Sequence, residues 1–118
     1  MNIQIYCHKK NFDVQKAERF FRERRIPYQM LDLKKHRLGE REVRLMLSCI
    51  GAEELLDRND QKVREHPACY YDRADMLIPA IQENPWLIKG PIVRNGNEMT
   101  SGNKPEIWAK WQEKEAAK

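Results

Sequence analysis

The chain has 118 residues, of which 41% are hydrophobic and 34% charged, a balance typical of one well-solvated globular domain over residues 1–118 rather than of a disordered chain. Its apolar runs are only a few residues long and its start shows no secretory signal, so we expect no membrane span and a cytoplasmic location. The net charge of +4 comes from 22 basic residues interspersed with 18 acidic ones, and nucleic acid is therefore not the expected partner.

The first third of the chain predicts a strand, a helix and a second strand. Residues 2–6 alternate between apolar and polar side chains, as a strand does. After a polar loop, Asp13 can cap a helix that runs to about Arg25. Pro27 ends this helix before a second strand over 28–33. A strand, helix and strand in this order form a βαβ unit with parallel strands, which predicts an α/β core.

The middle of the chain is predicted to be mainly helical. Residues 40–50 repeat apolar side chains at helical spacing and end at Gly51, and a short helix is expected over 53–56. The charged stretch 57–65 predicts a loop. A further helix is expected over 72–83, with a proline as a doubtful position near its middle. Its inward side chains are predicted to be Met76, Leu77, Ala80 and Ile81.

The last third predicts a hairpin and a closing helix. Residues 92–93 and 99–100 flank Asn95 and Gly96, a dipeptide that supplies the positive φ angles of a type I′ turn. Pro105 suits the first turn of a helix, and apolar residues follow it at helical spacing. The aromatic residues at packing spacings, expected in the core, are Phe20, Phe21, Trp108 and Trp111.

Two segments resemble the hallmark motifs of the arsenate reductase and Spx-like proteins. Residues 5–17 read Ile-Tyr, five residues, then Phe-Asp-Val-Gln-Lys-Ala, and resemble the first active-site loop and helix of that family. Residues 84–93, Asn-Pro-Trp-Leu-Ile-Lys-Gly-Pro-Ile-Val, resemble its second motif. The resemblance implies an α/β fold of the thioredoxin-like, glutaredoxin-like type, with a four-stranded mixed sheet flanked by helices and a helical insertion after the second strand.

The sequence departs from the family pattern at the positions of the nucleophile and of the arginines that bind the oxyanion. By this resemblance the nucleophilic cysteine falls on Asn11, and the second cysteine of Spx-type relatives falls on Val14. The arginine of the second motif is replaced by Gly90, and another arginine used for the oxyanion falls near Asp57, with Arg58 beside it. An amide can accept hydrogen bonds or cap a helix, but it is neither a nucleophile nor a redox group. These residues predict a vacated active site.

Lysines in loops that should converge in this fold are candidate ligands for a small anion. A helix N-terminus together with ammonium groups is a physically sufficient oxyanion site, although lysines are also common solvated surface residues. The resemblance further implies that the second motif contains a cis proline. The candidate binding residues are Lys9, Lys10, Asn11, Lys89, Gly90, Pro91 and Lys104, and ligand stacking stays open beside packing for Trp86.

The cysteines and histidines show no metal or disulfide spacing, so we expect no metal and no cofactor. Cys7, at the end of the first strand, is either a surrogate nucleophile or an inert buried thiol. Cys49 is expected to pack on its helix, and Cys69 to be an exposed loop thiol. The side chains expected to be solvated are His8, His36 and His66.

Two functions remain open at this point. One is a binding or regulatory module that keeps the fold, has lost the redox centre and holds a protein partner or a small oxyanion, and Spx-like relatives, which act by contacting RNA polymerase, make regulation conceivable. The alternative is an arsenate reductase-like oxidoreductase that uses Cys7 with glutathione or glutaredoxin as the thiol partner. Because removal of a covalent nucleophile abolishes its route, the residues favour the binding module.

Overall fold

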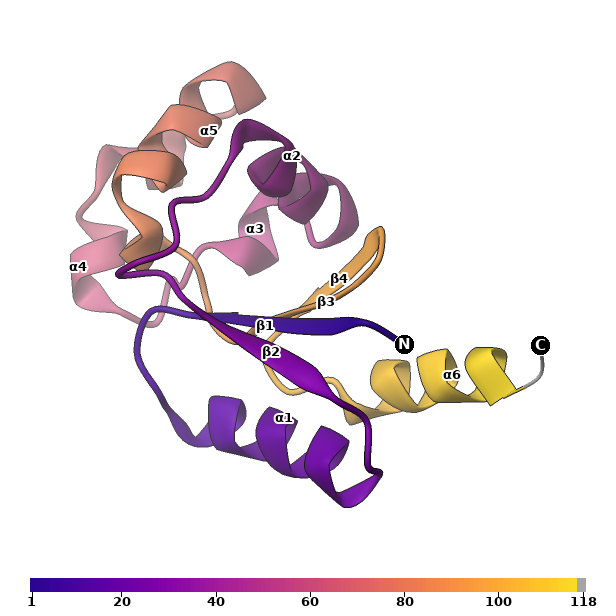
Figure 1. Cartoon of the computed structure of the whole chain (residues 1–118). Coiled ribbons are helices and arrows are strands. Elements are labelled where there is room, and N and C mark those ends of the chain that lie inside the picture. The colour runs from indigo at the N-terminus through magenta and orange to yellow at the C-terminus, as the bar shows by residue number, and fades with distance from the viewer. Residues whose placement is uncertain (117–118) are drawn as a thin grey trace.

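A four-stranded mixed sheet lies at the centre of the computed structural model, which describes residues 1–116 (Figure 1). The strands are β1 (Ile3–Cys7), β2 (Tyr28–Asp32), β3 (Ile92–Asn95) and β4 (Glu98–Ser101). They lie in the order β2-β1-β3-β4, in which β1 is parallel to β2 and antiparallel to β3, and β3 is antiparallel to β4. The predicted α/β fold and its mixed sheet are confirmed.

Helices cover both faces of this sheet (Figure 1). On one face lie α1 (Phe12–Glu23) and α6 (Pro105–Ala116). The connection between β2 and β3 covers the other face and forms the predicted helical insertion. It contains α2 (Glu40–Cys49), α3 (Ala52–Leu55), α4 (Gln61–Arg64) and α5 (Ala74–Glu83), with two short 3₁₀ helices, η1 (Pro67–Tyr70) and η2 (Pro85–Leu87). No helix within residues 1–116 is long and apolar enough to cross a membrane.

The side chains of β1 alternate between two hydrophobic cores, because successive residues of a strand point to opposite faces. Ile3 and Ile5 are buried against α1 and α6, where Phe21 and Trp108 are also fully buried. Tyr6 points to the other face and is fully buried in the core of the insertion. The packing role predicted for Phe20, Phe21, Trp108 and Trp111 is confirmed.

The first helix ends two residues earlier than the sequence predicts. Arg25 has a φ of +57°, a left-handed conformation that cannot continue a helix. The N–H of Arg25 donates to the carbonyl of Arg22 at 3.1 Å, and that of Ile26 to the carbonyl of Phe21 at 2.9 Å. These two bonds form a Schellman motif, with arginine at the position that glycine usually takes.

Two expectations for the insertion are wrong. The stretch 57–65 contains α4, because the Asp60 carboxylate caps a helical turn by accepting from the backbone N–H of Lys62 at 2.9 Å. In α5 the side chain of Met76 is 48% exposed, whereas Ile78 is buried. Pro79 is accommodated inside α5 at an exposed position.

A polar network around Glu42 joins β1 to the start of α2. The Glu42 carboxylate accepts hydrogen bonds from the Tyr6 hydroxyl at 2.7 Å and from the Gly39 N–H at 2.8 Å. His36 Nε2 lies 3.0 Å from the same carboxylate. Burial alone would raise the pKa of Glu42, but the hydrogen bonds from Gly39, Tyr6 and His36 outweigh it and lower the pKa. His36 is therefore a partner in this network and not the solvated residue that the sequence predicts.

We predict that Glu42→Gln lowers the free energy of unfolding by about 1–2 kcal/mol at pH 7, because the neutral amide accepts fewer and weaker hydrogen bonds. A carboxylate whose pKa is lowered by folding stabilises the protein above its unfolded pKa of about 4.3, and this contribution is lost as the pH falls through the folded pKa. Urea unfolding of both proteins from pH 7 to pH 3 should show their difference shrinking below about pH 4. A difference that stays constant over this range would contradict the prediction.

Candidate functional site

The candidate site lies at the carboxyl end of β1, where residues 8–11 lead into α1. Asn11 is extended, with φ −136° and ψ −176°, and its Oδ1 accepts from the backbone N–H of Val14 at 2.8 Å. Asn11 is therefore the N-cap of α1, and the predicted capping by Asp13 is wrong. Asp13 instead lies in the first turn, where a carboxylate interacts favourably with the helix dipole.

The second motif reaches this site through backbone pairing with the insertion. The N–H of Asp57 donates to the carbonyl of Leu87 at 2.9 Å, and the N–H of Lys89 to the carbonyl of Leu55 at 2.7 Å. The bond between Gly90 and its following proline is cis. A Cβ built on Gly90 would lie 3.8 Å from the Cα of Cys7 and 3.8 Å from the carbonyl oxygen of Tyr6. The second motif thus lies directly against the end of β1.

These segments enclose a cavity of about 200 Å³ at the start of α1, which we call the hollow. Its charged groups are two lysines and two aspartates, so the ammonium and carboxylate charges balance. An amide, an imidazole and an indole add hydrogen-bonding and stacking surfaces. The lining residues are His8, Lys9, Asn11, Asp57, Asp60, Lys62, Trp86, Ile88 and Gly90.

The indole ring of Trp86 lines the hollow, and a lysine side chain of the same protein already covers this ring. The ammonium of Lys62 lies 4.2 Å from the centroid of the indole, a cation–π contact. His66 packs edge-on against the same indole with ring centroids 5.6 Å apart, and its Nδ1 accepts from the N–H of Ala68 at 3.0 Å. His66 is therefore held in place, and the expectation that it is solvated is wrong.

Only part of the predicted set lines the hollow. Lys9, Asn11 and Gly90 do, together with His8, whose pKa is lowered first by burial and then by Lys34 and Lys9. His8 is thus half-buried and lines the hollow instead of being solvated.

The other predicted lysines do not converge on the hollow. The ammonium of Lys10 lies 3.8 Å from Glu18, and that of Lys104 lies 3.2 Å from Glu54 beside a different hollow. Lys89 uses its backbone, since its carbonyl accepts from the Ser101 hydroxyl at 2.7 Å. The neighbouring Pro91 is buried.

Sequence reasoning missed Asp60 and Lys62 as members of the site. Both belong to the segment expected to be a loop, and α4 places them at the hollow. The available signal was Asp60 itself, because aspartate is among the preferred N-cap residues of a helix.

The three cysteines are free and differ in exposure. Cys7 is 7% exposed, and its pKa is raised first by burial and then by the charge of Asp32. Cys49 is exposed and its thiol donates to the carbonyl of Asn97 at 3.3 Å, so its predicted packing role is wrong. Cys69 is half-buried, with its thiol 3.0 Å from the carbonyl of Val63, and is not the exposed thiol expected. Within residues 1–116, no three His, Cys, Asp or Glu side chains form a group that could hold a metal ion.

A family model described as the ArsC family matches residues 6–111 of the chain. Among solved structures, the YFFB (PA3664) protein is 23% identical, with a TM-score of 0.78 over 92% of this chain and 96% of that one. A putative ArsC family related protein from Bacteroides fragilis is 19% identical, with a TM-score of 0.77 over 93% of this chain and 97% of that one.

An arsenate reductase from Vibrio cholerae gives the same identity, TM-score and coverage as the Bacteroides fragilis protein. At these identities the likeness to solved structures shows the fold alone. A search of curated proteins finds no match.

We predict that Asn11→Cys creates the most acidic thiol of the chain. At the N-cap its sulfur would receive the Val14 N–H and the positive end of the helix dipole, both of which favour a thiolate, while Asp13 and Asp57 oppose it. We expect a pKa roughly one unit below the ordinary value of about 8.5. Iodoacetamide alkylation rates against pH, followed by peptide mass spectrometry, measure it.

The matched control for this prediction is Gln15→Cys, which places a thiol at an exposed position one turn further along α1. The new cysteine at position 11 should be alkylated faster at pH 7 than this control and than the three native cysteines. Equal titration midpoints at positions 11 and 15 would show that the helix N-terminus does not activate a thiol here.

Proposed function

The chain belongs to the ArsC family, and we propose that it acts as a cytoplasmic binding or regulatory module whose thiol redox centre has been lost. The hollow at the start of α1 is the binding site in this proposal. Its ligand in this proposal is a segment of a protein partner, because the lining of the hollow carries charges of both signs.

The observation that carries the proposal is the capping bond of Asn11. This residue falls on the position of the family's nucleophile, and its Oδ1 is engaged by the N–H of Val14 at 2.8 Å. A side-chain amide is a far weaker nucleophile than a thiolate, and because it contains no sulfur it cannot form or exchange a disulfide. The position therefore supports helix structure, and the proposal assigns it no chemistry.

The alternative enzyme would have to use Cys7. This cysteine lines a second hollow of about 240 Å³ with Lys9 and Lys10, which is the observation in its favour. However, burial raises the pKa of the Cys7 thiol, and Asp32 raises it further. Because the thiolate is the nucleophile, a buried thiol with a raised pKa reacts slowly at neutral pH. The binding module is therefore preferred.

The charges of the hollow indicate what it holds. Lys9 and Lys62 are offset by Asp57 and Asp60, and Gly90 contributes no side chain where the family motif has arginine. A free oxyanion would meet two carboxylates along with the two ammonium groups, and like charges disfavour it. A protein segment that carries both signs of charge can be matched to all four groups. This favours a protein partner over a small oxyanion.

We predict no arsenate reduction when the protein is incubated with arsenate, glutathione and glutaredoxin and arsenite is measured. The expected rate equals that of the same mixture without the protein, because no thiolate is available at position 11. An arsenate reductase that keeps its cysteine serves as the positive control.

Cys7→Ser separates the two functions. Arsenite formation by the wild-type protein that is abolished by Cys7→Ser would overturn the proposal and establish the enzyme. Arsenite formation that survives Cys7→Ser but is lost in Cys49→Ser or Cys69→Ser would assign the chemistry to another thiol and would equally overturn it.

A further inference from the structure

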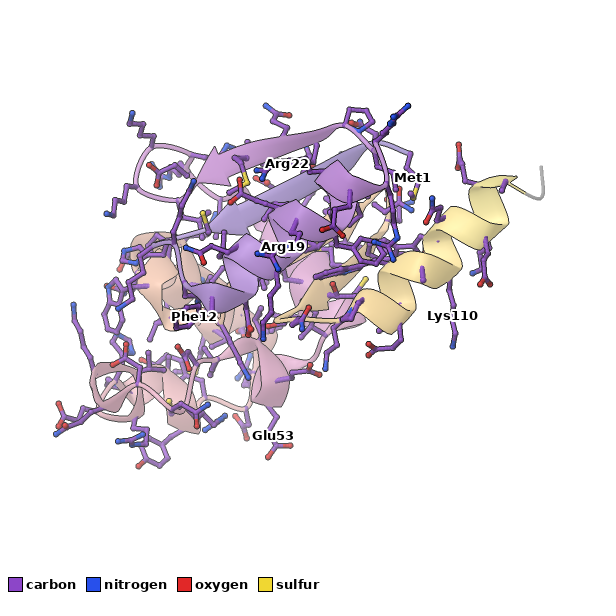
Figure 2. All side chains as sticks on the ribbon, turned by 90° about the horizontal axis from the view of Figure 1, so that it is seen from below. Met1, Phe12, Arg19, Arg22, Glu53 and Lys110 are labelled. Atoms are coloured by element: carbon purple, nitrogen blue, oxygen red, sulfur yellow. The ribbon has the colours of Figure 1, made fainter. Side chains whose placement is uncertain are left out.

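The outward side of α1 carries cations and one exposed aromatic ring. Its exposed residues include Phe12, Lys16, Arg19 and Arg22, which we call the basic face of α1. Figure 2, which views the molecule from the side of α1, shows Phe12, Arg19 and Arg22 following one another along the helix. Glu23 at the far end is the one acidic residue exposed on this helix.

Charge is distributed unevenly along the chain, and the basic face belongs to the positive part. Residues 1–39 contain ten Lys and Arg against four Asp and Glu. Residues 40–118 contain twelve against fourteen. The positive net charge of the protein therefore comes entirely from its first third, which includes α1 and the loop before it.

The cations of the basic face are largely free to bind another molecule. Within residues 1–116, no carboxylate lies within ion-pair distance of Lys16 or Arg19. Arg22 is 4.0 Å from Glu18, at the outer limit of an ion pair, and donates to the Tyr28 hydroxyl at 3.2 Å. Exposed pairs of this length contribute little to stability, so fold stability does not explain this concentration of charge.

Phe12 adds an apolar contact to the same face. Its side chain is 81% exposed at the first position of α1, four residues before Lys16 and seven before Arg19. Residues at this spacing lie on one side of a helix. Exposed aromatic rings beside arginine are the composition that protein interfaces favour.

We propose that the basic face of α1 is a docking surface for an acidic protein segment that places a large apolar side chain against Phe12. Carboxylates of the segment pair with Lys16, Arg19 and Arg22, and its apolar residue removes the Phe12 ring from water. This surface shares no residue with the hollow, so an acidic partner here does not depend on the ligand of the hollow.

The observations favour a protein segment over nucleic acid. The face has a single aromatic ring at one end, whereas surfaces that bind single strands interleave several rings with cations so that successive bases can stack. Glu23 lies at the other end of the face, where a phosphate backbone would bring a like charge. A polypeptide can end its acidic stretch before this position.

Selection from a displayed library of random 16-residue peptides tests the proposal without assuming a partner. Peptides are selected on the wild-type protein and counter-selected on Arg19→Glu. The selected pool should be enriched in Asp and Glu and carry at least one large apolar residue. A synthetic selected peptide, measured by fluorescence anisotropy, should bind Arg19→Glu and Phe12→Ala about tenfold more weakly than wild type.

Matched variants outside the face separate its contribution from overall charge and hydrophobicity. Lys110→Glu makes the same kind of charge reversal on the exposed side of α6 (Figure 2), and Tyr70→Ala removes a ring that is 84% exposed on η1. Both should bind the peptide within about twofold of wild type. All four changed side chains are exposed, and thermal unfolding monitored by circular dichroism confirms that each variant is folded.

Three results would overturn the proposal. One is a pool no richer in acidic residues than the starting library. Another is equal loss of binding in Arg19→Glu and Lys110→Glu, which would reduce the effect to net charge. The third is a 16-nucleotide single-stranded DNA that binds wild type more tightly than the peptide and is unaffected by Phe12→Ala, which would assign the face to nucleic acid.

Discussion

The burial of β1 on both faces is the constraint on which the rest of the structure depends. Ile3 and Ile5 are buried on one side and Tyr6 on the other, so the strand cannot shift by one residue without exchanging its two cores. Its carboxyl end therefore has a fixed place. The loop to α1 starts there, and Gly90 packs against Cys7 and Tyr6 at the same point. Two motifs about 80 residues apart in the sequence meet because one strand holds both.

Three of the four charged groups of the hollow come from the insertion, and the fourth, Lys9, comes from the loop between β1 and α1. Backbone bonds between residues 55–57 and 87–89 carry Asp57 to the second motif, and the cap of α4 carries Asp60 and Lys62 there. Each of these groups is oriented by local backbone geometry, and none belongs to the two motifs. The two ammonium groups and two carboxylates of the lining therefore balance. This balance bears on which ligand would fit the hollow, whereas the sheet and its helices do not depend on it.

The sequence predicts the parts of the fold that depend on local periodicity and not the parts that depend on side-chain pairing across the chain. The alternation of residues 2–6 predicts β1 correctly, and the Asn95-Gly96 dipeptide correctly marks a hairpin, because period and turn chemistry are local. The predicted type I′ turn centred on Asn95 and Gly96 is wrong. Asn95 pairs with Glu98, so Gly96 and Asn97 form the turn, and of these two only Gly96 has a positive φ. The expected convergence of four lysines does not form, since Lys10 and Lys104 pair with Glu18 and Glu54. Those partners could not be chosen from spacing alone. Arg25 in a left-handed conformation likewise has no signal, because glycine is the residue expected there.

Asparagine at position 11 is compatible with the fold for a reason separate from any chemistry. Helix N-termini leave N–H groups without partners, and asparagine is among the best residues for satisfying them, contributing about 1 kcal/mol relative to a residue that cannot cap. The bond from Val14 to Asn11 meets this need in α1. An asparagine in place of a nucleophile at such a position would exchange reactivity for helix stability, the trade-off expected where an active-site residue is replaced by one that suits the fold. The proposed loss of the redox centre would therefore leave β1, α1 and the hollow intact, and a binding function could persist on the same framework.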